Sequence, residues 1–303
     1  MNNKVVIFGS NGFVGKALVF FLENKGFNVI TVSRSCGNSD LNLDITNKEA
    51  FKRIDSQPNI VINCASMLPN GSFWEEESLR AMFEVNFWGS YNIAQWIKNT
   101  PSVTQLINLS TLVVHDKPWS INLDELEKVY PFKANQSYPI SKLNQELVFQ
   151  ILALENNVKV ANLRLSAIFG EDMKWGGIMC SIIDKAINSE TLNITNGDLV
   201  SFDFLHVNNV CEMIEKVIHN PSNEIINIAS GNEIFLKDLA EKTYSYLNVD
   251  LNLINNTTTK GINKNRAVVN INKIKNLFDE NYSINFLEQL NKLIDYRVKQ
   301  KNN

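Results

Sequence analysis

The sequence lacks the features that would place it in a membrane or on nucleic acid. Its longest apolar run near the start, residues 17–22, is far shorter than the ~20 residues that a membrane-spanning helix needs. The 29 lysines and arginines do not outnumber the 32 aspartates and glutamates, so there is no basic surplus for nucleic acid or an anionic membrane. No cleavable signal is recognisable before the first strand-like segment. We therefore expect a cytoplasmic protein with small-molecule ligands, no membrane and no nucleic acid.

Cysteine is scarce and scattered. Its four positions, Cys36, Cys64, Cys180 and Cys211, form no C-x-x-C pair and have no His or Cys at the spacing of metal ligands. We interpret them as buried thiols and expect no metal site. Internal repeats and low-complexity segments are also lacking, although the C-terminal tail is rich in Asn and Lys.

What the sequence has is enough apolar material for a large core, 44% of 303 residues. Short apolar runs that suit buried strands alternate with segments of helical periodicity, and this order predicts a doubly wound parallel sheet, the Rossmann arrangement. The predicted strands are residues 4–8, 27–32, 60–63, 106–109 and 158–165. The predicted helices are residues 13–24, 46–56, 75–98 and 137–156.

After residue 165 the pattern loosens into short strands and helices broken by glycines, which indicates a smaller C-terminal α/β lobe. Residues 200–207 and 224–228 again resemble apolar strands, so the two lobes are expected to interleave. We therefore predict an NAD(P)-binding Rossmann domain over residues 1–165, to which residues 200–228 return. A substrate-binding lobe is predicted over residues 166–199 and 229–303.

Three glycines, Gly9, Gly12 and Gly15, lie where the first strand ends and the first helix begins. In such a turn the first glycine permits a tight bend, the second lets the backbone approach a pyrophosphate, and the third allows close helix packing. A purely structural strand-to-helix turn is the alternative.

The end of the second strand bears on the choice of dinucleotide. A carboxylate there would bind the ribose 2′-hydroxyl of NAD, whereas an arginine accommodates the 2′-phosphate of NADP. The residues present are Ser33, Arg34 and Ser35, with no carboxylate before Asp40. This favours NADP(H), while NAD(H) stays possible if Arg34 is only a solvated surface residue.

Tyr138 and Lys142 stand four residues apart at the start of a predicted helix, so both side chains emerge on one face. A neighbouring ammonium and the positive nicotinamide of a bound cofactor would favour the phenolate and lower the tyrosine pKa, which would let Tyr138 exchange a proton with a carbinol or carbonyl oxygen. The Y-x-x-x-K pattern gains weight because Ser110 and Thr111 close an earlier strand, and Glu146 follows in the same helix.

Together the G-x-x-G-x-x-G loop, the strand-end hydroxyl and the Y-x-x-S-K-x-x-x-E run resemble the extended short-chain dehydrogenases, the NAD-dependent epimerase/dehydratase family. The resemblance covers nearly the whole chain. It implies that Thr111, with Ser110 as fallback, bonds the substrate oxygen, and that Asn86 supports Lys142. The dinucleotide contacts that it implies are Gly9, Asn11, Gly12, Phe13, Val14, Gly15, Ser33, Arg34, Ser35, Asp44, Ile45, Cys64, Ala65, Ser66, Asn86, Leu109, Tyr138 and Lys142.

Departures from the family pattern reduce the number of reactions that this chain is expected to catalyse. Related 4,6-dehydratases carry Asp-Glu directly after the catalytic threonine, where this chain has Leu112 and Val113, which cannot move protons. A cysteine used by a similar epimerase-reductase is also replaced by Val113. What the resemblance leaves is hydride transfer with Tyr138, either as reduction of a keto sugar or as 4-epimerisation.

The C-terminal lobe also departs from the resemblance. Phe202 replaces the arginine of an R-D-F-x-H-V segment that would contact a nucleotide diphosphate, and Ala167 replaces an asparagine. Arg266 resembles a second phosphate-binding arginine and Lys174 could assist, although either could be an ordinary surface residue. His206 is interpreted as structural rather than as a catalytic base. Trp74, Trp88 and Trp96 are assigned to the core or to a dimer contact.

We therefore expect an NADPH-dependent reductase of a nucleotide-linked 4-keto-6-deoxy sugar. An NAD-dependent nucleotide-sugar 4-epimerase and a noncatalytic dinucleotide-binding redox sensor are the alternatives. The resemblance also implies a homodimer through the helices at residues 75–98 and 137–156.

Overall fold

A seven-stranded parallel sheet forms the centre of the larger half of the molecule. The computed structural model describes residues 4–35, 39–54, 57–68, 75–129, 137–173, 177–261, 264–279 and 283–302. In spatial order the strands are β10 (Ile225–Ile228), β6 (Lys159–Leu165), β5 (Gln105–Thr111), β4 (Ile60–Asn63), β1 (Lys4–Phe8), β2 (Asn28–Ser33) and β3 (Leu41–Asn42). Every neighbouring pair is parallel. The strand order reverses between β1 and β4, which confirms the Rossmann arrangement and marks the edge where such sheets bind ligands.

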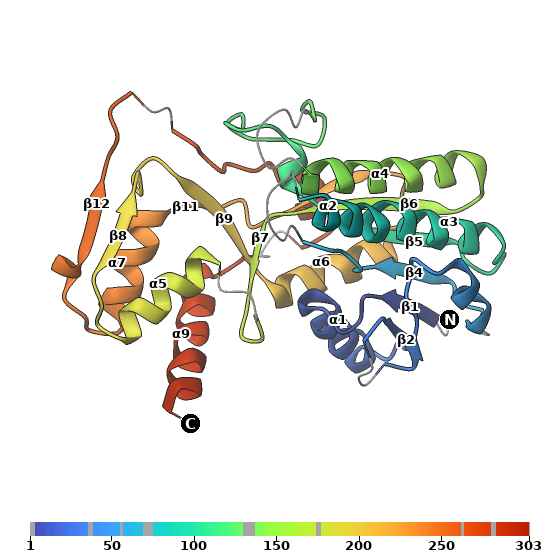
Figure 1. The fold of residues 1–303 in the computed structure, drawn as a ribbon, viewed down its shortest axis with the longest axis horizontal. Coiled ribbons are helices and arrows are strands. Elements are labelled where there is room, and N and C mark those ends of the chain that lie inside the picture. Colours follow the sequence, from blue (N-terminus) through green and yellow to red (C-terminus); the bar gives the residue numbers. More distant parts are fainter. Residues whose placement is uncertain are drawn as a thin grey trace.

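The side chains of β1 point alternately to the two faces of this sheet, and each face is covered by a hydrophobic core. Val5 and Ile7 pack on one face against α1 (Phe13–Asn24) and α6 (Val207–His219). Val6 and Phe8 pack on the other face against α3 (Ser90–Lys98) and α4 (Ser137–Glu155). Figure 1 shows the two helical layers on either side of the sheet.

The predicted helix at residues 75–98 is present but is not uniform. It runs as α2 (Glu76–Phe83), a π-helical turn over Glu84–Gly89 and then α3. Turns of π-helix inside α-helices occur frequently at functional sites, and this one contains Asn86.

The prediction of a helix at residues 46–56 was wrong in type and length. A 3₁₀-helix covers only Lys48–Arg53, and its first turn is capped by the Asn47 side chain, which accepts from the Glu49 N–H. Asn47 favours such a cap because its side-chain oxygen competes with the backbone for the first N–H groups. Residues 55 and 56 lie outside the described part of the chain.

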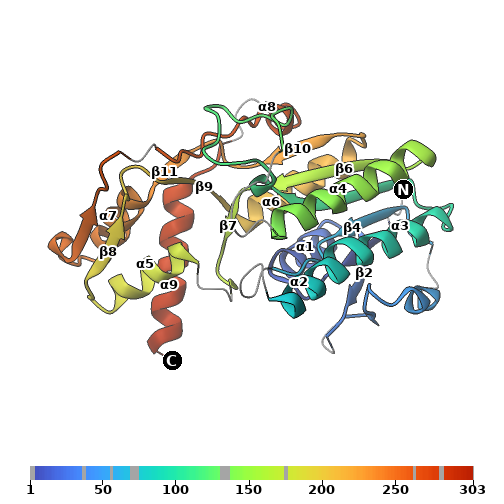
Figure 2. The ribbon, with the colours of Figure 1, turned by 45° about the horizontal axis from the view of Figure 1, so that its top comes forward.

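The smaller half is built on two short sheets and three helices, as Figures 1 and 2 show. One sheet has the order β11 (Glu233–Phe235), β9 (Ser201–His206) and β7 (Ala167–Phe169); the other pairs β12 (Ile254–Thr257) with β8 (Leu192–Thr195). Their core is shared with α5 (Ile178–Ile187), α7 (Leu236–Tyr246) and α9 (Phe286–Asn302). Short helical segments also lie at Leu112–Val114, Leu251–Leu253 and Asn272–Lys275.

The segment at residues 200–228, expected to return to the Rossmann domain, divides between the halves. Strand β9 belongs to the three-stranded sheet, whereas α6 packs on α1 and β10 pairs with β6. The residue at the division is His206. Its Nδ1 accepts from the Asn208 N–H at the start of α6, and its Nε2 lies 3.0 Å from Glu171 Oε2, contacts that suit a structural histidine.

Candidate active site

The glycine loop between β1 and α1 is built for a close approach of backbone to backbone. Gly9 has a φ of +78°, and a Cβ there would lie 2.6 Å from the Ala65 nitrogen. A Cβ on Gly15 would lie 2.2 Å from the Gly9 carbonyl oxygen, which excludes any larger residue. Helix α1 has no side-chain cap and no acidic residue in its first turn, so its positive end is open to an anion. The buried Ser10 hydroxyl has no hydrogen-bond partner among the described residues.

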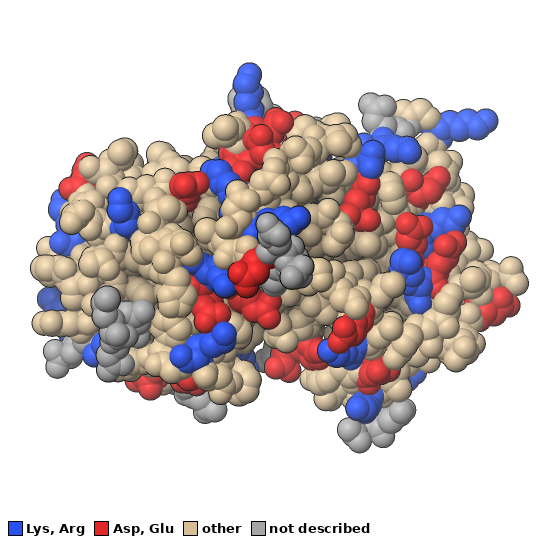
Figure 3. All heavy atoms as spheres, turned by 180° about the vertical axis from the view of Figure 1, so that it is seen from behind, with Lys and Arg blue, Asp and Glu red and all other residues tan. Residues whose placement is uncertain are grey.

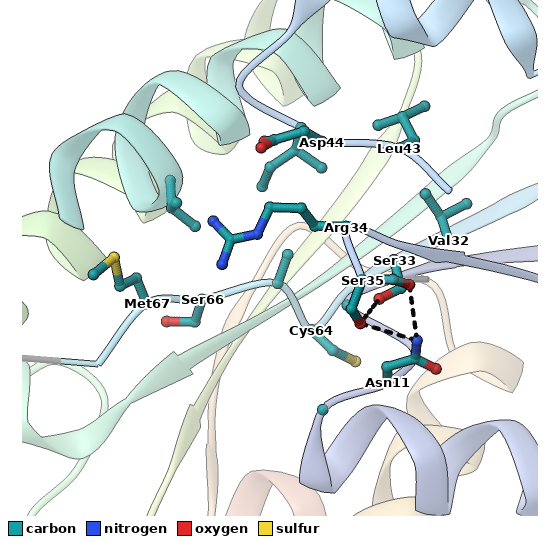
Figure 4. Close-up of a pocket in the computed structure, with 15 residues that line it drawn as sticks. Asn11, Val32, Ser33, Arg34, Ser35, Leu43, Asp44, Cys64, Ser66 and Met67 are labelled. Atoms are coloured by element: carbon teal, nitrogen blue, oxygen red, sulfur yellow. Dashed lines mark hydrogen bonds between the residues drawn. The ribbon is translucent and has the colours of Figure 1, made fainter. Parts of the chain in front are cut away.

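A pocket of about 540 Å³ lies over this loop at the carboxyl edge of the sheet. Figure 4 shows its lining. The lining includes most of the residues predicted to contact a dinucleotide, namely Gly9, Asn11, Gly12, Ser33, Arg34, Ser35, Asp44, Ile45, Cys64, Ala65 and Ser66. It adds four that the sequence did not indicate, Val32, Leu43, Met67 and Val85. The remaining predicted contacts, Phe13, Val14, Gly15, Asn86, Leu109, Tyr138 and Lys142, are not part of this lining.

Polar side chains gather at the end of β2, where the Arg34 guanidinium points away from the Ser33 and Ser35 hydroxyls (Figure 4). The Ser33 and Ser35 hydroxyls lie 3.2 Å apart, and the Asn11 amide donates to the Ser35 hydroxyl at 3.3 Å. Arg34 itself is exposed and lines the pocket (Figure 4). Asp40, the first carboxylate after the strand, accepts from the Thr31 N–H and hydroxyl at 2.9 and 2.8 Å. The pocket therefore offers a cation and two hydroxyls where an NAD site would offer a carboxylate.

Asp44 and Cys64 lie on opposite parts of this lining. One oxygen of Asp44 accepts from the Thr46 N–H and hydroxyl, both at 2.9 Å, which fixes the carboxylate at the pocket edge. Cys64 is half-buried there, whereas a buried thiol was expected. Cys180 and Cys211 are buried as expected, and Cys36 lies outside the described residues.

A row of asparagines across three strands holds the loop that carries Cys64, Ala65 and Ser66. Asn63, Asn108 and Asn162 lie level with one another on β4, β5 and β6 and are buried. Asn63 donates to Asn108 at 3.1 Å, and Asn108 donates to Asn162 at 2.8 Å. The Asn63 oxygen then accepts from the Ala65 N–H at 3.2 Å. Each amide in the row orients its neighbour, and Asn63 fixes the wall of the pocket through its contact with Ala65.

Tyr138 lies in the first turn of α4 and is half-buried. Burial raises its pKa above the ordinary value, and a hydrogen bond with the Ser66 hydroxyl only partly opposes that rise. Desolvation thus disfavours the phenolate in the protein itself, while the lowered pKa expected beside Lys142 and the nicotinamide of a bound dinucleotide stays a prediction. A tyrosine that keeps its proton at neutral pH suits the role of a proton donor.

Lys142 lies one turn further along α4 and is almost completely buried. Its ammonium donates to the Leu109 carbonyl at 2.6 Å and to the Gln145 side-chain oxygen at 2.5 Å. Burial lowers the pKa of Lys142 to about 8, although the Glu146 carboxylate opposes the shift. Gln145 was missed by sequence reasoning. Its place at i+3 from Lys142 on a helix was the available signal.

Asn86 contacts the helix of Tyr138 and Lys142 through both its side chain and its backbone. Its side chain donates to the Ser141 hydroxyl at 2.9 Å and accepts from the Met67 N–H at 2.7 Å. The link to Lys142 uses the backbone carbonyl of Asn86, which accepts from the Gln145 amide at 3.3 Å. The π-helical turn thus connects the pocket wall to α4.

The two hydroxyls predicted to bond the substrate, those of Ser110 and Thr111, lie at the end of β5 in different surroundings. Ser110 is buried and donates to Glu146 at 2.5 Å, so it is engaged within the fold. Thr111 is half-buried, and its Oγ1 accepts from the Val113 N–H at 3.3 Å. Because that bond uses an oxygen lone pair, the Thr111 O–H is still able to donate to a carbonyl oxygen.

Behind Ser110 lies a buried ion pair. Arg164 donates to the two oxygens of Glu146 at 3.0 and 2.8 Å, and each side chain is 2% exposed. Arg164 also lies 3.1 Å from His115 Nε2. Burial and the Arg164 charge lower the pKa of His115 to about 4, so His115 is neutral and accepts this hydrogen bond. The pair ties the end of β5 to α4 and β6.

A second pocket, of about 120 Å³, begins at Thr111 and is hereafter called the substrate pocket. Its lining comes from both halves of the molecule: Thr111, Leu112, Val113, Lys117, Trp119, Leu165, Ser166, Ala167, Ser201, Phe202, Asp203 and Ala267. The two halves therefore meet where the predicted carbonyl contact lies.

Arg266, one of the two predicted phosphate contacts of the C-terminal lobe, is not part of this lining. The Arg266 guanidinium forms a bidentate pair with Glu233, with its Nε 2.9 Å from Oε1. A neighbouring carboxylate thus already occupies the fork that would bind phosphate. Lys174 lies outside the described residues.

No group of three His, Cys, Asp or Glu side chains that could hold a metal occurs in the described ranges. None of the helices described there is long and apolar enough to cross a membrane. Over the face shown in Figure 3, acidic and basic side chains are interspersed.

Comparison with known proteins places the chain in a family. The sequence profile of the NAD dependent epimerase/dehydratase family matches residues 5–229, which is more than half of the chain. No curated protein sequence matches significantly. The chain therefore belongs to the NAD dependent epimerase/dehydratase family and is an enzyme of the short-chain dehydrogenase/reductase type.

Solved structures agree in fold over almost the whole chain. An epimerase from Methanothermobacter thermautotrophicus superposes with a TM-score of 0.82 at 18% identity, covering 99% of this chain and 94% of that one. A UDP-N-acetylglucosamine 4-epimerase from Bacillus cereus gives 0.81 at 17% identity, with 96% and 95% covered. A dTDP-glucose 4,6-dehydratase from Streptomyces venezuelae, solved with NAD bound, gives 0.82 at 17%, with 99% and 98% covered.

Proposed function

We propose that the protein is an NADPH-dependent reductase of a nucleotide-linked 4-keto-6-deoxy sugar. The observation that carries the cofactor is the end of β2, where Arg34 stands between two serines in the sequence and the next carboxylate along the chain, Asp40, is held by Thr31. A 2′-phosphate would find a guanidinium and hydroxyl donors there. The open first turn of α1 and the glycine loop fit the pyrophosphate of the same dinucleotide.

The catalytic residues fit a reduction. The dinucleotide supplies hydride when it is bound. Thr111 then holds the substrate carbonyl by donating its O–H, and Tyr138 gives a proton to the oxygen, which becomes a hydroxyl. The raised pKa of Tyr138 keeps that proton in place at neutral pH. Lys142 is held under the site by Leu109 and Gln145.

Aliphatic side chains next to Thr111 support reduction over other reactions of the family. Leu112 is buried and Val113 is exposed, and both line the substrate pocket with groups that carry no exchangeable proton. Loss of water or exchange of a carbon-bound proton needs an acid and a base near the reacting carbon. Simple hydride transfer needs only the hydroxyls of Thr111 and Tyr138.

An NAD-dependent 4-epimerase is the second candidate, because 4-epimerases occur among the structures with the same fold. The two functions differ in cofactor turnover. A reductase consumes NADPH in proportion to product, whereas a 4-epimerase retains NAD and shows no net redox change.

The test combines the purified protein with NADPH or NADH and a panel of nucleotide-linked 4-keto-6-deoxy sugars, following loss of cofactor absorbance. We expect oxidation of NADPH that Tyr138→Phe abolishes. Since a charge-assisted hydrogen bond contributes about 1.5–3 kcal/mol, Arg34→Ala should raise the KM for NADPH roughly 10- to 150-fold. Arg53→Ala, at another exposed arginine, is the matched control. No turnover, with tightly held NAD released on denaturation, would favour the epimerase.

We also propose a homodimer through α3 and α4. Large apolar side chains are exposed on these helices and on the π-helical turn that precedes α3: Trp88, Tyr91, Leu147, Ile151 and Leu154, the last of them 86% exposed. Apolar groups gathered in this way commonly mark a protein interface. Sedimentation of the wild type as a dimer at micromolar concentration, and of Leu147→Lys as a monomer, is the expected result. A wild-type monomer would refute the proposal.

A further inference from the structure

Gln145 is a completely buried amide on α4 that contacts the Lys142 ammonium and lines neither pocket. Its side-chain oxygen accepts from Lys142 Nζ at 2.5 Å. Its side-chain nitrogen donates to the Ser90 hydroxyl at 2.7 Å and to the Asn86 backbone carbonyl at 3.3 Å. Gln145 therefore joins the lysine of the site to the π-helical turn and to the first residue of α3.

The orientation of this amide follows from its neighbours. The Asn86 carbonyl can only accept hydrogen bonds. The Ser90 hydroxyl gives its one proton to that carbonyl at 2.8 Å, so its oxygen is left to accept from Gln145. Because both neighbours on this side are acceptors, the amide nitrogen must face them. The amide oxygen is thereby directed at Lys142.

Other ionisable groups that act on Lys142 are neutral or already paired. The Glu146 carboxylate raises the pKa of Lys142, but it is shared with the Arg164 guanidinium. Cys64 also acts on Lys142, and burial raises the pKa of its thiol, which keeps its proton at neutral pH. Burial raises the pKa of Tyr138 as well. The ammonium therefore depends strongly on the hydrogen bonds that it donates.

A neutral acceptor at residue 145 leaves the charge of Lys142 in balance. Burial lowers the pKa of Lys142 to about 8, although hydrogen bonds to Leu109 and Gln145 stabilise the ammonium. A carboxylate in place of the amide would keep the ammonium charged well above that pH. An apolar side chain would remove one of the two acceptors, and burial would then take away the charge at a lower pH.

We propose that Gln145 is a positioning residue for Lys142 and that its neutral amide sets the pH range in which Lys142 keeps its charge. The inference rests on the proposed function, because it takes Lys142 as a residue of the reducing site. Gln145 acts through Lys142, since it lines neither pocket.

The experiment replaces Gln145 in two opposite ways. Gln145→Glu supplies a carboxylate of nearly the same shape, and Gln145→Met supplies an apolar side chain of similar length. Gln150→Glu and Gln150→Met, further along α4 at a half-buried position, are the matched controls. NMR of protein isotopically labelled at lysine follows the ionisation of Lys142, whose signal is identified by its absence in Lys142→Arg. This measurement needs neither cofactor nor substrate.

The titration of Lys142 should move in opposite directions in the two variants. The Lys142 pKa, about 8 in the wild type, should rise by about 1–3 pH units in Gln145→Glu, beside an opposite charge. It should fall by about one pH unit or more in Gln145→Met, which loses a hydrogen bond to the charged form. A glutamine that only stabilises the fold would produce no such opposition. Equal titrations, or shifts in the same direction, would overturn the proposal; if Gln145→Glu does not fold, an unshifted Gln145→Met would do so.

The pH profile of NADPH-dependent turnover provides the second measurement. The fall of kcat/KM at alkaline pH should move upward in Gln145→Glu and downward in Gln145→Met, and it should stay in place in the Gln150 variants. A wild type without turnover contradicts the proposed function, and the NMR titration then decides on Gln145. Normal turnover with an unmoved titration contradicts the role of Gln145 alone.

Discussion

Replacement of Glu146 by glutamine should destabilise the protein far more than its small chemical change suggests. The substitution leaves the Arg164 guanidinium, 2% exposed, without its counter-charge. His115, which lies 3.1 Å from Arg164, cannot replace the lost negative charge, because an imidazole is either neutral or positively charged. Removal of one partner from a buried ion pair costs about 3–5 kcal/mol, out of a total free energy of unfolding of about 5–15 kcal/mol.

Urea unfolding followed by tryptophan fluorescence measures this loss. The matched control is Glu288→Gln, which removes the partner of Lys292 at 2.7 Å on α9, where both side chains are more than half exposed. An exposed pair of this kind contributes only about 0.3–0.5 kcal/mol. If Glu146→Gln costs no more than Glu288→Gln, the reasoning that burial sets the cost is refuted.

A second comparison separates the charge from the packing. In Glu146→Met combined with Arg164→Leu, both charges are removed and the volume is largely kept. Apolar replacement of a whole buried pair is often neutral or stabilising, so the double variant should be more stable than Glu146→Gln alone. A double variant that is less stable would show that the hydrogen bonds from Ser110 and to His115 dominate instead.

Three other substitutions test the site. Gly15→Ala places a Cβ 2.2 Å from the Gly9 carbonyl and should abolish NADPH binding in a fluorescence titration, whereas Gly177→Ala, whose nearest contact is 3.5 Å, should bind normally. Because the Lys142 pKa is about 8, its ammonium is charged below that pH and neutral above it. A pH profile of kcat/KM should therefore fall as pH rises through about 8, and an unchanged profile in Lys142→Arg would contradict the assignment. Asn108→Leu removes the acceptor of the buried Asn63 amide and the donor to the buried Asn162 oxygen, so thermal unfolding should show a loss of about 1–3 kcal/mol. A weaker NADPH complex should accompany that loss, and full affinity would show that the asparagine row does not position Ala65.

The larger half of the fold could be predicted because its signals are local. Apolar strands such as residues 4–8 and 60–63, and the glycines between β1 and α1, each determine structure within a few residues of themselves. The same is true of Tyr138 and Lys142, whose spacing alone places them on one face of α4. The comparisons confirm the family and the fold, while the individual site residues stay predictions.

The features that escaped prediction depend on partners distant in sequence. The sequence around Arg266 does not indicate that its guanidinium pairs with Glu233, since the two residues meet only when β11 lies beside β9. The pKa of Tyr138 depends on how deeply α4 is buried, which its own sequence does not determine. The same is true of Asn108, whose neighbours on β4 and β6 are set by the register of the sheet.

The two pockets are lined by different parts of the chain. The dinucleotide pocket is lined entirely by residues 9–67 and Val85, whereas the substrate pocket joins residues 111–119 to residues as late as Ala267. During synthesis the groups that line the first pocket all emerge well before those that complete the second. Variation in the last third of the chain can therefore alter the lining of the second pocket while the lining of the first stays as it is.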